Sequence, residues 1–220
     1  LLAIIIGIPL GIWSHQSPLL RRIALPINNV FQTIPTLALL AFLVPLLGIG
    51  FKPAIVTLTL YALLPITRNT FTSLDNIDRD MVEAANGLGF TSWQRLRLIE
   101  LTMALPVIIT GIRLATAMAI GITTVAALIG AGGLGEFITE GLALNDSRLI
   151  LLGAIPTALL ALIIDALFAQ IEILLKKPII KASFRKTRWS VVIVSTLLCV
   201  WMLASEVMPL NTRQQKIITI

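Results

Sequence analysis

The chain has 220 residues and a formal net charge of +6; 57% of its residues are hydrophobic and 13% are charged. Its mean hydropathy of +0.95 lies far above that of soluble globular proteins, so the composition predicts an all-α polytopic membrane protein. The single cysteine, Cys199, excludes an internal disulfide and suggests no metal site, and the sequence lacks the Gly-rich phosphate-binding motif of an ATPase.

The first apolar run covers residues 1–13. As a helix it would reach roughly 20 Å, whereas the apolar core of a membrane is about 30 Å thick, so we interpret the run as a truncated span. A polar loop is expected at residues 14–29. A second span is expected at residues 30–50, where Pro35 and Pro45 should introduce kinks.

The remaining apolar runs predict further spans at residues 54–67, 105–130 and 149–175, with a polar, glycine-rich loop at 131–147. Residues 1–175 would thus form one transmembrane domain with five spans, the first truncated. Beyond it we expect a basic linker at 176–188, an additional transmembrane helix at 189–206 as a sixth span, and a polar tail at 207–220.

Residues 83–106 form the longest polar interruption between the spans. Ala84 and Ala85 favour a helix, and Gly89 can adopt a positive φ and end it. Thr91 or Ser92 can then cap a second helix. The segment therefore predicts two short helices joined by a tight glycine turn.

The basic residues indicate on which side of the membrane this segment lies. If it is cytoplasmic, twelve Lys and Arg residues fall on the cytoplasmic side and four on the other, in agreement with the positive-inside rule. Because the basic residues lie at span ends, and not on one face, the charge of +6 does not indicate nucleic acid binding. The polar tail then lies outside the cell. The cytoplasmic residues are Arg21, Arg22, Arg68, Arg79, Arg95, Arg97, Lys176, Lys177, Lys181, Arg185, Lys186 and Arg188; the others are Lys52, Arg148, Arg213 and Lys216.

The polar segment resembles the "EAA loop" of the membrane subunits of ATP-binding-cassette (ABC) importers. The sequence departs from the pattern at Thr102, where the family has proline; a Leu-Pro pair follows at Leu105-Pro106. The resemblance implies a cytoplasmic coupling loop at about residues 71–104, whose first short helix docks on a separate ATPase subunit. ATP and Mg²⁺ would bind to that subunit, and this chain would bind no cofactor and catalyse no reaction. The matching residues are Glu83, Ala84, Ala85, Gly89, Ile99 and Leu101.

Three further stretches carry a more specific resemblance. They are the glycine run 130–135, the segment 32–40 that begins Gln-Thr-Ile-Pro, and the segment 61–70 that begins Tyr-Ala-Leu-Leu-Pro. The first looks like importer permeases for methionine and for quaternary amines, and the other two look most like the glycine betaine, choline and carnitine group of bacterial plasma-membrane permeases.

That resemblance implies a second permease subunit and an extracytoplasmic substrate-binding protein. The segment 216–220, which is rich in β-branched residues, could instead begin a binding domain fused to the permease, or belong to a frayed tail. The alternatives left open are a permease for methionine or another small solute and, from a different class, a secondary transporter. A secondary transporter would usually show internal repeats and intramembrane ion-binding groups, which the sequence does not suggest.

Two charged residues are expected inside the membrane. Arg113 in the fourth span and Asp165 in the fifth both lie roughly 15 Å from the cytoplasmic end of their helices, so an ion pair between them is plausible. We expect it to brace two helices rather than to contact substrate. Glu172, with Lys176 four residues later, is expected to form an ordinary pair on one helix face.

Overall fold

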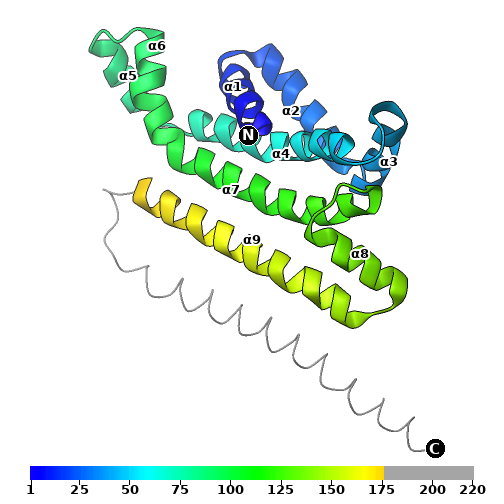
Figure 1. Cartoon of the computed structure of the whole chain (residues 1–220). Coiled ribbons are helices and arrows are strands. Elements are labelled where there is room, and N and C mark those ends of the chain that lie inside the picture. Colours follow the sequence, from blue (N-terminus) through cyan, green and yellow to red (C-terminus); the bar gives the residue numbers. More distant parts are fainter. Residues whose placement is uncertain (176–220) are drawn as a thin grey trace, which may run out of the picture. The chain divides into compact units, whose positions relative to one another are not determined.

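The computed structural model describes residues 1–175, and these residues form a helical membrane domain with no β-strand in that range (Figure 1). The basic linker expected at 176–188, the helix expected at 189–206 and the tail at 207–220 lie outside the described residues. The α-helices are α1 (Leu2–Gln16), α2 (Pro18–Thr33), α3 (Thr36–Leu47), α4 (Phe51–Asp75), α5 (Arg79–Gly87), α6 (Ser92–Arg95), α7 (Leu101–Ala126), α8 (Leu134–Leu144) and α9 (Ser147–Leu175).

Helix α4 lies between α1 and α7, and close contacts at glycines hold the three helices together. A Cβ atom on Gly11 of α1 would lie 2.6 Å from Cβ of Thr70, and a Cβ atom on Gly111 of α7 would lie 2.8 Å from the Pro65 carbonyl oxygen. Small residues at such crossings let membrane helices approach closely. The buried side chains of Ile66 and Ile108 fill the core between these helices.

The prediction of a polar loop at residues 14–29 is wrong, because α1 and α2 cover nearly all of that range. The span expected at residues 30–50 is broken: α2 and α3 meet at an angle of 96°. The break lies at Ile34 and Pro35, where Ile34 has an extended backbone, as a residue before proline prefers. Pro35 therefore ends one helix rather than kinking a single span, while Pro45 lies within α3.

The third predicted span is longer than expected, since α4 continues to Asp75. The prediction of a glycine-rich loop at residues 131–147 is also largely wrong, because helix α8 occupies the centre of that range. Its glycines serve close packing: a Cβ on Gly135 would lie 2.6 Å from the Thr124 carbonyl oxygen of α7. Likewise, a Cβ on Gly153 of α9 would lie 2.7 Å from the Leu134 carbonyl oxygen of α8.

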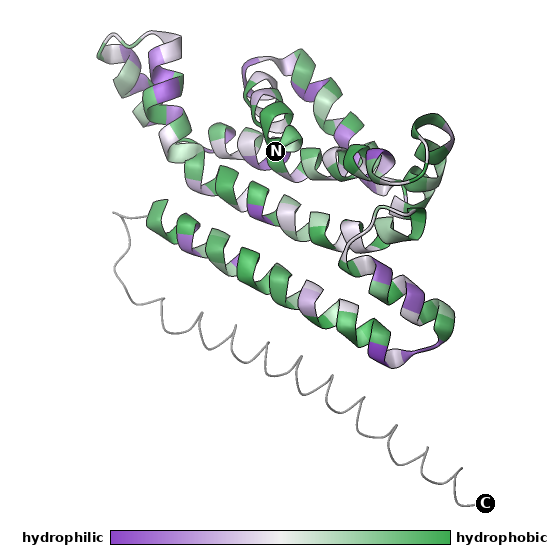
Figure 2. Ribbon diagram, viewed as in Figure 1, coloured by the Kyte–Doolittle hydropathy of each residue, from purple (hydrophilic) through white to green (hydrophobic). Residues whose placement is uncertain are grey.

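The fourth span begins earlier than the expected residue 105. Helix α6, a π-helical turn at Leu96–Glu100, α7 and a 3₁₀ turn at Ala127–Ile129 form one continuous apolar helix, Ser92–Ile129. Within the described residues, this helix and Ser147–Leu175 are long and apolar enough to cross a membrane, and the bent pair α2–α3 would be a third such element. Figure 2 shows mainly apolar residues along α9 and more polar ones at the α5–α6 hairpin.

Candidate functional site

Helices α5 and α6 form a hairpin at one end of α7, as the sequence predicted (Figure 1). The Asp78 carboxylate caps α5 by accepting a 3.0 Å hydrogen bond from the Asp80 N–H. Gly89 joins the helices with a φ of +80°, a conformation that favours glycine. Thr91 caps α6: the Gln94 N–H donates to Thr91 Oγ1, and the Thr91 N–H donates to Gln94 Oε1 at 2.9 Å.

The residues predicted to form the coupling site all lie on this hairpin. Glu83 and Ala84 are exposed on α5, and Gly89 is exposed in the turn. Ala85 is only 1% exposed and packs inside the hairpin, so the two alanines have different surroundings. Glu83 does not cap α5, because Asp78 does so.

Large apolar side chains lie on the outside of the hairpin. Leu88 is 78% exposed, Trp93 is 66% exposed, and Met81 is also exposed. Aromatic residues and methionine are enriched in protein–protein interfaces. The hairpin thus presents an apolar surface with charged neighbours, suitable for contact with another protein.

An arginine, Arg95, fixes the hairpin to the base of α7. No sequence pattern predicted this contact. Arg95 Nη1 donates a 2.7 Å hydrogen bond to Asn86 Oδ1 on α5, and Arg95 Nε lies 2.7 Å from Glu100 Oε1. Glu100 is 5% exposed, so the positive charge of Arg95 neutralises the charge of a buried carboxylate. Arg95 and Glu100 are five residues apart, a spacing that does not bring side chains together in an α-helix. The π-helical turn Leu96–Glu100 brings them together, and π-turns frequently occur at functional sites.

The structure brings Arg113 and Asp165 together between α7 and α9. Arg113 Nε and Nη2 donate to the two Asp165 carboxylate oxygens at 2.5 Å and 2.6 Å. Glu172 is buried and its Oε2 atom lies 3.4 Å from Arg113 Nη1, a contact that was not expected from the sequence. Lys176, the partner proposed for it, lies outside the described residues.

Polar contacts also stabilise the bend between α2 and α3. Pro65 has no N–H, which leaves the carbonyl of Tyr61 without its helical donor, and Gln32 Nε2 donates to that carbonyl at 3.3 Å. The Tyr61 hydroxyl in turn donates to the Ile34 carbonyl at the bend. In the sequence these segments stand out only by their resemblance to known permeases, and no pattern pairs them.

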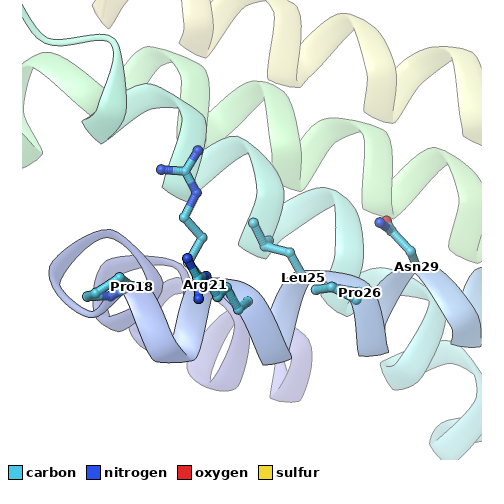
Figure 3. Close-up of a pocket in the computed structure, with 6 residues that line it drawn as sticks. Pro18, Arg21, Leu25, Pro26 and Asn29 are labelled. Atoms are coloured by element: carbon cyan, nitrogen blue, oxygen red, sulfur yellow. The ribbon is translucent and has the colours of Figure 1, made fainter.

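A shallow hollow of about 490 Å³ lies along α2 (Figure 3). It is separate from the hairpin and from the Arg113 ion pair. No group of three or more His, Cys, Asp or Glu residues within 1–175 is placed to hold a metal ion. The residues that line the hollow along α2 are Pro18, Arg21, Arg22, Leu25, Pro26 and Asn29.

Apolar helices of membrane-spanning length, with an exposed hairpin at the end of one of them, define a membrane-embedded protein. Residues 3–177 match the sequence model of the family described as "Binding-protein-dependent transport system inner membrane component". The chain therefore belongs to this family of transport permeases.

Curated relatives agree with this assignment. The chain is 43% identical over 171 residues to the glycine betaine/carnitine/choline transport system permease protein OpuCB of Bacillus subtilis (strain 168), covering 78% of this chain and 79% of that protein. It is 44% identical over 179 residues to the osmoprotectant import permease protein OsmW of Salmonella typhimurium, covering 79% and 83%.

A solved structure shares the fold. Inward-facing MetNI, a methionine ABC transporter, superimposes with a TM-score of 0.73 at 24% identity, covering 80% of this chain and 88% of the matched chain. The recognition of an ABC importer permease from the sequence is thus confirmed by the family and the relatives.

Proposed function

We propose that this chain is the permease subunit of an ATP-driven importer for quaternary-amine compatible solutes of the glycine betaine, choline and carnitine class. The names of relatives at 43–44% identity, each aligned over more than three quarters of this chain, support that substrate class. The observation that carries the transport mechanism is the exposed α5–α6 hairpin, rigidly bonded to the membrane helix α7.

The hairpin lies on the cytoplasmic side in this proposal, and the tail beyond residue 207 lies outside the bacterial inner membrane. The excess of Lys and Arg on the hairpin side supports this orientation. The proposed span count is five within residues 1–175, with a sixth at 189–206. The bent pair α2–α3 serves as one of these spans, and α4, with 25 residues, is long enough to serve as another.

The hairpin transmits the movement of the ATPase to the membrane helices. The ATPase binds ATP and Mg²⁺, and it contacts the exposed face of α5 at Glu83 and Ala84 together with the apolar side chains of Leu88 and Trp93. Gly89 sets the angle between α5 and α6. Because Arg95 bonds both to α5 and to the start of α7, a displacement of the hairpin is carried into α7.

The complex further contains a second permease subunit, identical or paralogous, and a substrate-binding protein or fused binding domain outside the membrane. Helix α9 exposes many large apolar side chains, among them Leu152, Leu159, Ile163 and Leu167, to lipid or to the second subunit. The family description itself names a binding-protein-dependent system, which supports the external partner.

A methionine permease is the second candidate, and the fold shared with MetNI favours it. That likeness, at 24% identity, concerns the fold, whereas the relatives at higher identity are named for osmoprotectants. Competition for uptake separates the two: glycine betaine, choline or carnitine should compete, and methionine should not.

The test of the proposal is co-purification of the tagged chain with the ATPase encoded beside it, followed by uptake in vesicles. Gly89→Asp places a charged side chain in a turn with positive φ, and we expect ATP hydrolysis to continue while uptake is lost. Gly87→Ala is the matched control, because Gly87 lies in α5 and an added Cβ would meet no atom within 4 Å. An intact wild-type chain that binds no ATPase would overturn the proposal.

A further inference from the structure

We propose that the hollow along α2 binds the headgroup of an anionic phospholipid in the cytoplasmic leaflet. The inference rests on the orientation given in the proposed function, which places the start of α2 at the cytoplasmic surface. It concerns residues that take no part in the hairpin or in the Arg113 ion pair. Anionic phospholipids share a phosphodiester group in the headgroup, linked to acyl chains.

The charged end of the hollow carries two adjacent arginines. Arg21 and Arg22 are both exposed, and within residues 1–175 neither forms an ion pair. No acidic residue lines the hollow. Guanidinium groups bind phosphate oxygens through two parallel hydrogen bonds, so this pair is suited to a phosphodiester.

One of the two arginines is already held in place. The guanidinium carbon of Arg21 lies 4.8 Å from the ring centre of Phe71 on α4. This cation–π contact restricts a side chain that would otherwise have many rotamers, and ordering it in advance reduces the entropy lost on binding. Phe71 itself is buried, so the anchor is fixed by the helix core.

The rest of the hollow suits a lipid better than a free anion. Leu25 and Pro26 continue it away from the arginines, and Figure 3 shows Arg21, Leu25 and Asn29 following one another along α2. Asn29 lies seven residues beyond Arg22, or about 10 Å along the helix, where an amide can bond an ester carbonyl.

The alternative occupants are a free phosphate and an acidic segment of the ATPase. A free phosphate would use the arginines but leave the apolar part of the hollow empty. An ATPase contact would likewise need only the charges. Basic pockets at the cytoplasmic ends of membrane helices are typical sites for anionic headgroups, so we favour the lipid.

The experiment uses the full chain co-purified with its ATPase and incubated in detergent with an equal mixture of phosphatidylglycerol and phosphatidylcholine. Lipid that remains bound after washing is quantified by mass spectrometry. We expect the wild-type complex to retain phosphatidylglycerol selectively, and Arg21→Gln/Arg22→Gln to retain on the order of tenfold less. The charge-matched control is Lys52→Gln/Arg148→Gln, which removes two exposed charges at the starts of α4 and α9 and should retain the wild-type amount.

Each outcome decides between the occupants. Equal retention by both double variants overturns the inference, as does full displacement of the lipid by millimolar inorganic phosphate or glycerol 3-phosphate. Release of the ATPase from the Arg21/Arg22 variant, with lipid retention unchanged, would assign the arginines to the partner instead. Lipid retention can also be measured on the full permease chain purified alone, so failure of wild-type ATPase binding would overturn the proposed function and leave the lipid measurement valid.

A variant that keeps the charges guards against misfolding. Arg21→Lys/Arg22→Lys preserves the attraction but loses the paired guanidinium bonds. We expect it to retain an intermediate amount of phosphatidylglycerol and to elute with the wild-type profile in size-exclusion chromatography. Retention as low as that of the glutamine pair would show that charge does not select the lipid.

Discussion

Arg113 on α7 and Asp165 on α9, 52 residues apart in the chain, form a two-pronged ion pair at 2.5 Å and 2.6 Å. Glu172 lies about two helical turns further along α9 and also bonds Arg113. One cation thus joins two carboxylates between helices that would otherwise contact each other mainly through apolar side chains. In a membrane such an arrangement is costly to disrupt and fixes the relative position of α7 and α9.

The three charges predict an order of severity among variants. Arg113→Gln removes the cation that bonds both carboxylates, and we expect it to lower the free energy of unfolding by about 3–5 kcal/mol. Asp165→Asn leaves Arg113 beside Glu172, so its cost should be smaller, about 1–3 kcal/mol. Unfolding in mixed detergent micelles measures both, together with the yield of folded protein.

Replacing all three groups provides the control. Arg113→Gln/Asp165→Asn/Glu172→Gln removes every charge at once, and neutral replacements of buried ion pairs are often tolerated. We expect it to recover part of the stability lost in Arg113→Gln. If Asp165→Asn left both folding yield and transport unchanged, the ion pair would contribute to neither stability nor transport.

The glycine turn offers a comparison of two neighbouring positions. Gly89 has a φ of +80°, and an added Cβ there would meet no atom, so Gly89→Ala would suffer only from backbone strain. That strain costs about 1–2 kcal/mol and should shift the angle between α5 and α6. We expect uptake to fall while ATP hydrolysis continues, whereas Gly87→Ala should keep wild-type uptake. Equal uptake by the two alanine variants would argue against the turn as a coupling element.

Arg95 and Arg97 allow the hairpin bond to be tested against a matched residue. Arg95→Gln removes the bonds to Asn86 and to buried Glu100, so hairpin motion should reach α7 less efficiently. We expect at least about fivefold less solute transported per ATP hydrolysed, the lower end of typical coupling energies. Arg97 is exposed on the same helix and lacks such bonds among the described residues, so Arg97→Gln should resemble wild type.

A purely structural role for Arg95 is distinguished by rescue. Arg95→Gln/Glu100→Gln relieves the buried carboxylate and should restore folding yield. It cannot restore the bonds to Glu100, so the ratio of uptake to ATP hydrolysis should remain low. Recovery of that ratio along with the yield would mean that Arg95 acts on stability alone.

The bend between α2 and α3 can be tested by a double-mutant cycle. Gln32→Leu removes the donor to the Tyr61 carbonyl and should cost about 1–3 kcal/mol. Pro65→Ala restores a backbone N–H to α4, which can satisfy that carbonyl instead. In the Pro65→Ala background, Gln32→Leu should therefore cost clearly less, as measured by thermal unfolding. Additive effects would show that Gln32 does not serve this carbonyl.

The elements whose signals are local could be predicted from the sequence. The length of α9 follows from an uninterrupted apolar run. The end of α5 follows from Gly89, and the start of α6 follows from the capping residue Thr91. The ion pair between Arg113 and Asp165 could be expected because two charges at equal depth in a membrane favour each other. The family, too, was recognisable from the spacing of residues in the hairpin.

Other features depend on tertiary contacts or on a local change of helical geometry, and they could not be predicted from the sequence. Residues 14–29 read as a loop, but contacts such as Arg21 with Phe71 allow them to form a helix. The glycines of α8 read as turn formers, yet Gly135 is there because α7 passes too close for a side chain. Arg95 and Glu100 meet only because a π-turn changes the helical spacing. In each case a contact made through space outweighs the local preference of the chain, and that contact is absent from any sequence pattern.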